Sequence, residues 1–153
     1  MPDSSRLNSV AQQWHALPWS DRRQLLAMVL LLPLIDLLLR VAGLRRTQRL
    51  LGLDDTSGVA LLPVSAASIA EGQRLARLAN VAGRRGVYTT TCLRQALAVQ
   101  WWLRRRQLPA ELRIGARTES GILHAHAWVV LGDIALGQTN ELPPIIHASP
   151  DHA

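Results

Sequence analysis

The longest apolar run of the chain extends from Leu25 to Leu39, inside a segment with the pattern of a helix. Ser20 is a candidate N-cap, and Gly43 stands where such a helix commonly stops. The run is shorter than the ~20 apolar residues of a membrane span, and it contains Asp36, whose charge a bilayer interior disfavours. We therefore expect a helix over about residues 20–42 that is buried or faces a partner, with a short basic helix after it and no membrane span.

Two more helices are indicated farther along the chain. Ser68 and Glu71 have the S-x-x-E spacing of a capping box, and apolar residues follow at helical intervals. The next helix should begin near Thr91 or Cys92 and end before Pro109, with arginines in its last turn. Residues 52–66, which are rich in Gly, Asp, Ser and Pro, are expected to form a linker.

Alternation of apolar and polar residues indicates strands in the last third of the chain. The segments are Glu111–Ala116, Leu123–Leu131 and Ile134–Gln138, the last two joined by a tight turn at Gly132-Asp133. Helices followed by an antiparallel sheet define an α+β protein. We expect one compact unit, with an N-terminal helical region and linker (1–66) and a core (67–146).

Composition narrows the classes of function. All 17 basic residues are arginines, and the formal net charge is +6. The arginine clusters are dispersed and lack interleaved aromatic residues, which disfavours nucleic-acid binding. An acidic protein partner or a membrane surface suits this charge better. Because no basic stretch precedes a small-residue cleavage site, we expect a cytoplasmic protein, with association at the membrane surface as the alternative.

The single cysteine is the first candidate for chemistry. Cys92 has no partner for an internal disulfide, and one cysteine cannot build a cysteine-based zinc site. It is expected in the first turn of the third helix, where unpaired N–H groups and the positive end of the helix dipole favour a thiolate. The same N–H groups can hold the oxyanion of a tetrahedral intermediate.

A nucleophilic thiol needs a base. His124 and His126 lie two residues apart on one predicted strand, so both project from the same face as Trp128. Two histidines alone leave most positions of a metal ion unfilled, and no carboxylate is clearly placed beside them, so we expect no metal and no cofactor.

A third group should orient the imidazole. Asp133 lies in the predicted turn, ~20 Å of strand away from His126. A two-residue hairpin places Thr139 opposite His126, whereas a one-residue bulge places Gln138 or Asn140 there. The residues alone leave a Cys/His hydrolase, a non-catalytic helical adaptor with an inert cysteine and a weak metal module open as alternatives.

Several segments resemble the protease of lasso-peptide biosynthesis, the stand-alone counterpart of the C-terminal half of the fused maturation B proteins. They are CLRQALA from Cys92, LRRRQLPA from Leu103, LRIG from Leu112 and HAHAWV from His124. The resemblance covers about residues 20–138 and implies a papain/transglutaminase-like core in which the helix bearing the cysteine packs on a small antiparallel sheet. One departure is Gln107, where the family usually has Gly.

The resemblance implies roles for individual residues. Cys92 matches the nucleophile and His126 the general base. The third member, usually an acid on the strand after the hairpin, is matched by Gln138, with Asn140 and Asp133 as weaker candidates. Candidates for contact with a substrate or partner are Tyr88, His124 and Trp128.

The implied activity is a cysteine endopeptidase that removes the leader of a lasso-peptide precursor through an acyl-enzyme on Cys92. Besides the precursor peptide, the expected partners are a separate leader-binding protein, docked on the N-terminal helix and its arginine cluster, and a lasso cyclase that closes the ring afterwards. A transglutaminase-like acyltransferase with the same residue pair is the leading alternative, because the sequence does not show whether water or an amine accepts the acyl group.

Overall fold

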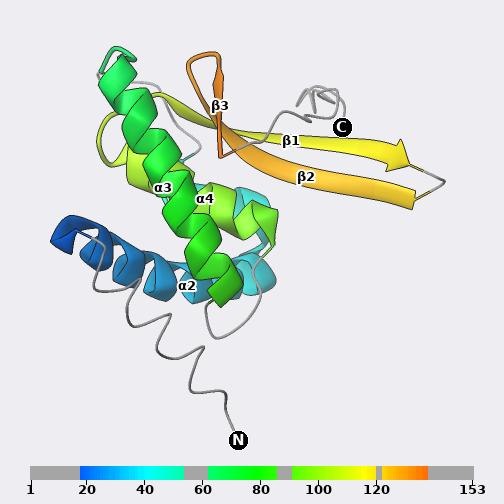
Figure 1. Ribbon diagram of the computed structural model, residues 1–153. Helices are drawn as coiled ribbons and strands as arrows, with labels where there is room; N and C mark the ends of the chain where they lie inside the picture. Colours follow the sequence, from blue (N-terminus) through cyan, green and yellow to red (C-terminus); the bar gives the residue numbers. More distant parts are fainter. Residues whose placement is uncertain (1–17, 54–61, 86–90, 120–121, 138–153) are drawn as a thin grey trace, which may run out of the picture.

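The computed structural model describes residues 18–53, 62–85, 91–119 and 122–137 (Figure 1). In chain order the elements are α2 (Trp19–Leu50), α3 (Ala66–Arg85), α4 (Cys92–Arg104), β1 (Ala110–Glu119), β2 (Ile122–Leu131) and β3 (Ile134–Leu136). The strands form an antiparallel sheet in the order β1-β2-β3, and α4 contacts β1 and β2 as well as α2 and α3. The predicted α+β fold is confirmed.

Helix α2 contains a break at the predicted position. Gly43 has φ 73° and ψ 172°, so it separates a long first helix from a short second one that ends at Leu50. The predicted N-cap is wrong, because Pro18 occupies that position and the Ser20 hydroxyl instead donates to the neighbouring Asp21 carboxylate at 3.2 Å. By length and composition α2 could cross a membrane.

Helix α3 begins one turn before the predicted capping box. The Ser65 hydroxyl accepts a hydrogen bond from the Ser68 N–H at 3.2 Å, and the Ser68 hydroxyl accepts one from the Ser65 N–H at 2.8 Å. These reciprocal bonds satisfy the N–H groups of Ser65 and Ser68, so Ser65 caps the helix and Ser68 is its partner. The pairing of Ser68 with Glu71 as the box was therefore wrong, and Glu71 binds Arg74 instead.

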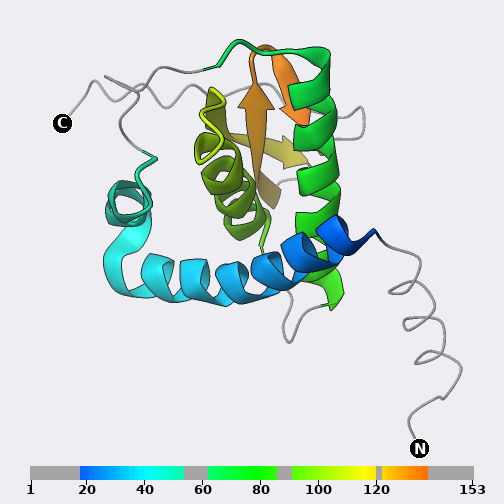
Figure 2. The ribbon, with the colours of Figure 1, turned by 90° about the vertical axis from the view of Figure 1, so that its left-hand side faces the viewer.

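The hydrophobic core lies where α4 is enclosed by α2, α3 and the sheet (Figure 2). Leu97 and Leu103 of α4 are fully buried, as are Ile35 of α2, Leu75 of α3 and Leu131 of β2. Because residues from all these elements belong to one core cluster, α2 is packed as part of the same unit as the sheet. The predicted boundary at residue 66 stays a prediction.

The hairpin of β2 and β3 has the predicted two-residue turn. Leu131 pairs with Ile134, and Gly132 adopts φ 62°, a conformation that glycine reaches without steric cost. The register continues without a bulge to the pair of Val129 and Leu136. β1 is longer than predicted, and the predicted end of β3 at Gln138 lies outside the described residues.

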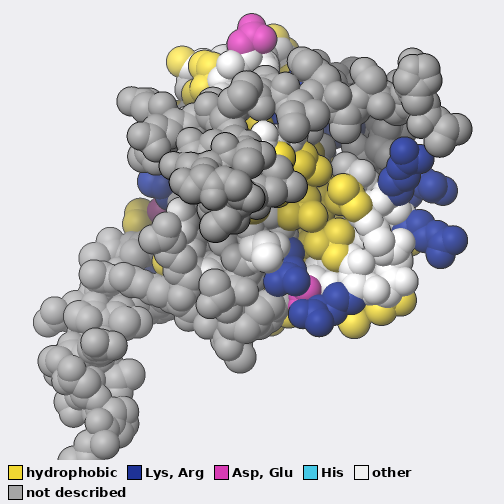
Figure 3. Space-filling model, turned by 90° about the vertical axis from the view of Figure 1, so that its right-hand side faces the viewer, with side chains coloured by type: hydrophobic (Ala, Val, Ile, Leu, Met, Phe, Trp, Pro, Cys, Tyr) yellow, Lys and Arg dark blue, Asp and Glu magenta, His cyan; other side chains and the backbone are white. Residues whose placement is uncertain are grey.

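Several large hydrophobic side chains remain at the surface of the described residues. The face in Figure 3 shows a patch of hydrophobic side chains bordered by arginines. Most of the strongly exposed leucines belong to α2, whose other face is buried against α3 and α4. The molecule therefore presents both basic and apolar surface.

Candidate active site

Cys92 is the first residue of α4, as expected. Thr91 occupies the N-cap position with extended backbone angles, and its carbonyl accepts the N–H groups of Arg94 and Gln95 at 3.1 and 3.3 Å. The first amide groups of a helix have no acceptor within the helix and carry the positive end of its dipole. The half-buried thiol of Cys92 therefore lies at a position that favours negative charge.

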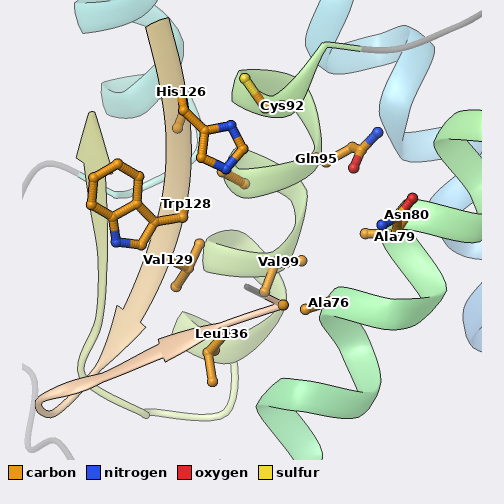
Figure 4. A pocket seen from close by; sticks show the side chains of 13 residues that line it. Ala76, Ala79, Asn80, Cys92, Gln95, Val99, His126, Trp128, Val129 and Leu136 are labelled. Carbon is orange, nitrogen blue, oxygen red and sulfur yellow. The ribbon is translucent and has the colours of Figure 1, made fainter. Parts of the chain in front are cut away.

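His126 of β2 lines the same cavity as Cys92. The cavity has a volume of about 100 Å³ and is bounded by α3, α4, β2 and β3. Figure 4 shows the Cys92 and His126 side chains at the same end of the pocket, in the space between α4 and β2. The cross-strand neighbour of His126 is Gly115, which has no side chain to fill the space beside the imidazole.

Trp128 supports the imidazole. The two rings are stacked with their centroids 6.0 Å apart and their planes 18° from parallel. Trp128 is only 3% exposed, whereas His126, two residues earlier on the same face of β2, is half-buried. The indole ring therefore packs beside His126 and offers little surface to a substrate.

The remaining predicted site residues lie away from the pocket or outside the described residues. Asp133 is exposed in the turn after β2, and it does not line the pocket that holds Cys92 and His126. Tyr88, Gln138 and Asn140 lie outside the described residues, as does the side chain of His124. The identity of the third member of the site stays a prediction.

Two polar residues that the sequence analysis missed also line the pocket. Gln95 lies three residues after Cys92 on α4, and Asn80 comes from α3 (Figure 4). Helical spacing from Cys92 could have identified Gln95, because residues three apart share a helix face. Asn80 had no such signal, since its place beside the pocket depends on how α3 packs against α4.

An ion pair anchors the beginning of α4 to α2. Arg94, two residues after Cys92, contacts the Asp36 carboxylate at 2.6 Å, and both side chains are largely buried. The Nε of Arg40 donates to both oxygens of Asp36, at 3.1 and 3.0 Å, from its more exposed position. A carboxylate inside the apolar stretch of α2 thus has a structural partner, and removing one member would leave a charge poorly solvated.

A second ionic cluster joins three helices. Glu71 of α3 binds Arg74 at 2.7 Å and also contacts Arg106, just after α4, while Arg74 contacts Asp21 of α2. The hydrogen bond from Arg74 is the main reason that the pKa of Glu71 lies below its ordinary value, with a further contribution from Arg106 and an opposing effect of burial. The pKa of Arg74 is raised in turn, chiefly by its hydrogen bond to Glu71.

Comparison with known families bears on these residues. The family model of the transglutaminase-like superfamily matches residues 31–143, a stretch that contains both Cys92 and His126. The chain belongs to the transglutaminase-like superfamily. The superfamily includes cysteine proteases and acyltransferases and is typically enzymatic. No curated protein and no solved structure gives a significant match to the chain.

In this transglutaminase-like domain, the described residues contain no group of three or more His, Cys, Asp or Glu side chains placed to hold a metal ion. The chemistry that its pocket can support is nucleophilic attack by a thiolate with an imidazole as proton acceptor and donor. A cysteine at a helix start and a histidine on the adjoining strand match this division of roles.

Proposed function

We propose that the protein is a cysteine endopeptidase that removes the leader from a lasso-peptide precursor. The observation that carries the proposal is the shared pocket of Cys92 and His126, which come from the start of α4 and the middle of β2. The superfamily match supports the chemical class, and the HAHAWV segment around His126 supports the narrower assignment.

The proposed reaction has two steps. In the first, His126 takes the proton of Cys92, and the thiolate attacks the carbonyl carbon of the last leader residue. A C–S bond forms, and amide groups at the start of α4 stabilise the oxyanion. His126 then gives its proton to the leaving nitrogen, the C–N bond breaks, and the core peptide departs with a free N-terminus.

In the second step, water hydrolyses the acyl-enzyme. His126 accepts a proton from the attacking water, the C–S bond breaks, and the leader leaves as a carboxylic acid while the thiol of Cys92 is restored. The reaction needs no metal and no redox cofactor. A leader-binding protein would deliver the precursor, and a cyclase would use the amine that the cleavage exposes.

The superfamily match also favours a second candidate, an acyltransferase with the same first step. An amine would then replace water as the acceptor of the acyl group on Cys92. The two candidates differ only in the product, because hydrolysis leaves a carboxylic acid and transfer leaves a new amide.

Mass spectrometry of a precursor peptide tests both. The wild-type protein, Cys92→Ala and His126→Ala would be incubated with the precursor and its leader-binding protein, with and without an added primary amine. We expect one cut at the junction of leader and core and a loss of about 10³-fold or more in both variants. His124→Ala is the comparison and should keep kcat, because the general base is assigned to His126, while a raised KM would support the predicted contact of His124 with the substrate.

Each alternative outcome has a clear meaning. A product that carries the added amine would show that the protein is an acyltransferase and not a protease. Cleavage that survives Cys92→Ala would overturn the nucleophile. An intact peptide with retained binding of the leader-binding protein would favour the non-catalytic adaptor.

The third member of the site can be tested in the same assay. Gln138→Ala should lower kcat if this amide orients His126, and Gln138→Glu, which restores the usual acid of the lasso-peptide protease, should keep or raise it. Asn140→Ala is the comparison, and a loss confined to this variant would move the assignment from Gln138 to Asn140.

A further inference from the structure

The outward face of α2 is apolar along most of its length. From Leu26 to Leu37, every exposed residue of the helix is Leu or Pro. The exposed fractions of the large side chains on this face are 52% for Leu26, 74% for Leu30, 50% for Leu34, 58% for Leu37 and 78% for Val41. Their spacing of three or four residues places them in one stripe along the helix.

The charges of α2 are sorted between its two faces. Its acidic residues, Asp21 and Asp36, are both largely buried and contact Arg74 of α3 and Arg94 of α4. Exposed arginines stand at both ends of the apolar stripe. They are Arg23 before it, Arg40 beside its last residue, and Arg45, Arg46 and Arg49 after the break at Gly43. Positively charged side chains therefore flank the stripe on both sides, and both carboxylates of α2 are turned to the neighbouring helices.

This face forms an edge of the molecule. In Figure 2, α2 runs along one side, with α3, α4 and the sheet all lying on its other side. Trp19, 71% exposed, stands at the N-terminal end of the stripe. A leucine stripe with arginines and a tryptophan at its margins is the pattern of a helix that lies in the interface of a membrane.

We propose that α2 docks the protein on an anionic lipid surface, with the stripe from Leu26 to Val41 inserted below the headgroups. The arginines at the two ends then lie at the level of the lipid phosphates. The helix lies in the plane of the membrane and does not span it. Spanning would separate the buried face of α2 from the core and expose Asp36 to lipid.

Charge argues against a second copy of this chain as the occupant. If two α2 helices packed antiparallel along their stripes, the arginines after Val41 would lie close to Arg23 of the other copy. In a parallel arrangement, each arginine cluster would lie beside the same cluster of the other copy. Both arrangements bring like charges together and are disfavoured by repulsion. The leader-binding protein was expected to dock on this helix, but a protein partner would usually meet aromatic or hydrogen-bonding anchors at the centre of its interface, whereas the centre of this stripe offers only Leu and Pro. A bilayer requires only apolar area and basic margins.

Sedimentation with lipid vesicles tests the proposal on the full chain. We expect binding to vesicles that contain phosphatidylglycerol, weaker binding to pure phosphatidylcholine, and a decrease with added salt. The double variant Arg45→Gln/Arg46→Gln should weaken binding to the anionic vesicles about 30-fold. Each of Leu30→Gln and Leu37→Gln should weaken it about tenfold.

Matched controls come from α3. Arg77→Gln and Val81→Gln change an exposed arginine and an exposed valine outside α2 and should leave vesicle binding unchanged. Circular dichroism of every variant shows whether the fold is kept, which is expected because the substituted side chains are exposed.

Two results would overturn the proposal. One is the absence of binding to anionic vesicles by a folded wild-type protein, or binding that the α2 variants and the α3 controls weaken equally. The other is a dimer in light scattering that Leu30→Gln dissociates, because the stripe would then be covered by a second copy. Neither result depends on peptide cleavage, so the test of membrane binding and the test of the proposed protease activity are independent.

Discussion

The side-chain amide of Gln73 holds Gly137 at the end of the sheet. Its oxygen accepts a hydrogen bond from the Gly137 N–H at 2.9 Å, and its nitrogen donates to the carbonyl of Ala135 at 3.2 Å. One amide group of α3 thus bonds the backbone of β3 on both sides of Leu136, as a neighbouring strand would. This bond pair fixes the chain directly before Gln138, the proposed third member of the catalytic site.

Removing these bonds should weaken both stability and activity. Gln73→Met keeps the size of the side chain and removes both hydrogen bonds, so we expect a loss of about 1–2 kcal/mol in the free energy of unfolding. Because β3 leads to Gln138, kcat in the cleavage assay should fall while KM changes little. Urea unfolding and steady-state kinetics measure the two effects, and Gln73→Glu, which keeps the acceptor for Gly137, should restore part of the stability. Unchanged stability in Gln73→Met would show that the bonds are dispensable.

The contact between Gly137 and Ala76 is a second constraint on β3. Gly137 has φ +73°, and a Cβ atom there would lie 2.8 Å from the Cβ of Ala76. Gly137→Ala should therefore cost about 2–3 kcal/mol through backbone strain and steric overlap. Adding Ala76→Gly should relieve the overlap and leave the strain, so the double variant should be more stable than the two single effects predict. Chemical denaturation of all four proteins measures this coupling, and simple additivity would contradict the contact.

The sequence was informative where a local signal determines the structure. Gly43 predicted the break in α2, and the two-residue turn predicted the register of β2 and β3. Helical spacing predicted an inner stripe of Ile69, Leu75, Leu78 and Ala79 on α3, of which the last three are buried and Ile69 is partly buried. These features depend on backbone conformation or on periodicity, which are properties of adjacent residues.

The sequence was less informative where a choice depends on tertiary contacts. The sequence pattern pointed to Ser68 and Glu71 as the capping box, whereas Ser65 caps α3, and its bonds with Ser68 were not indicated by the S-x-x-E spacing. In the folded protein Glu71 is engaged by Arg74 and Arg106. For the site, Cys92 and His126 could be proposed from the sequence, whereas the place of Asn80 depends on helix packing.

Gln107 occupies a position that favours glycine. It has φ 58°, and it ends α4 in a Schellman motif, in which its N–H bonds the Arg104 carbonyl at 2.9 Å and the Leu108 N–H bonds the Leu103 carbonyl at 3.1 Å. Gln107→Gly should therefore stabilise the protein by about 1 kcal/mol, because it removes the strain of a side chain in the left-handed region.

Thermal unfolding of Gln107 variants measures this gain. We expect Gln107→Gly to raise Tm by about 3 °C. Gln107→Ala is the matched control and should give no such gain, because alanine carries the same steric strain at this φ. An equal rise in both variants would mean that the side chain of Gln107, and not its backbone conformation, is responsible.

The depressed pKa of Glu71 predicts a loss of stability in acid. Because the pKa of this carboxyl is lower in the folded protein than its ordinary value of 4.5, the unfolded chain binds more protons near and below pH 4.5. Its contribution is thus complete above the unfolded pKa and disappears as the pH falls through the folded pKa. Urea unfolding between neutral pH and about pH 3 should show the stability difference between wild type and Glu71→Gln shrinking below 4.5. Glu111→Gln, at an exposed carboxylate that binds Arg113, is the control, and a difference that shrank equally there would assign the acid sensitivity to carboxylates in general.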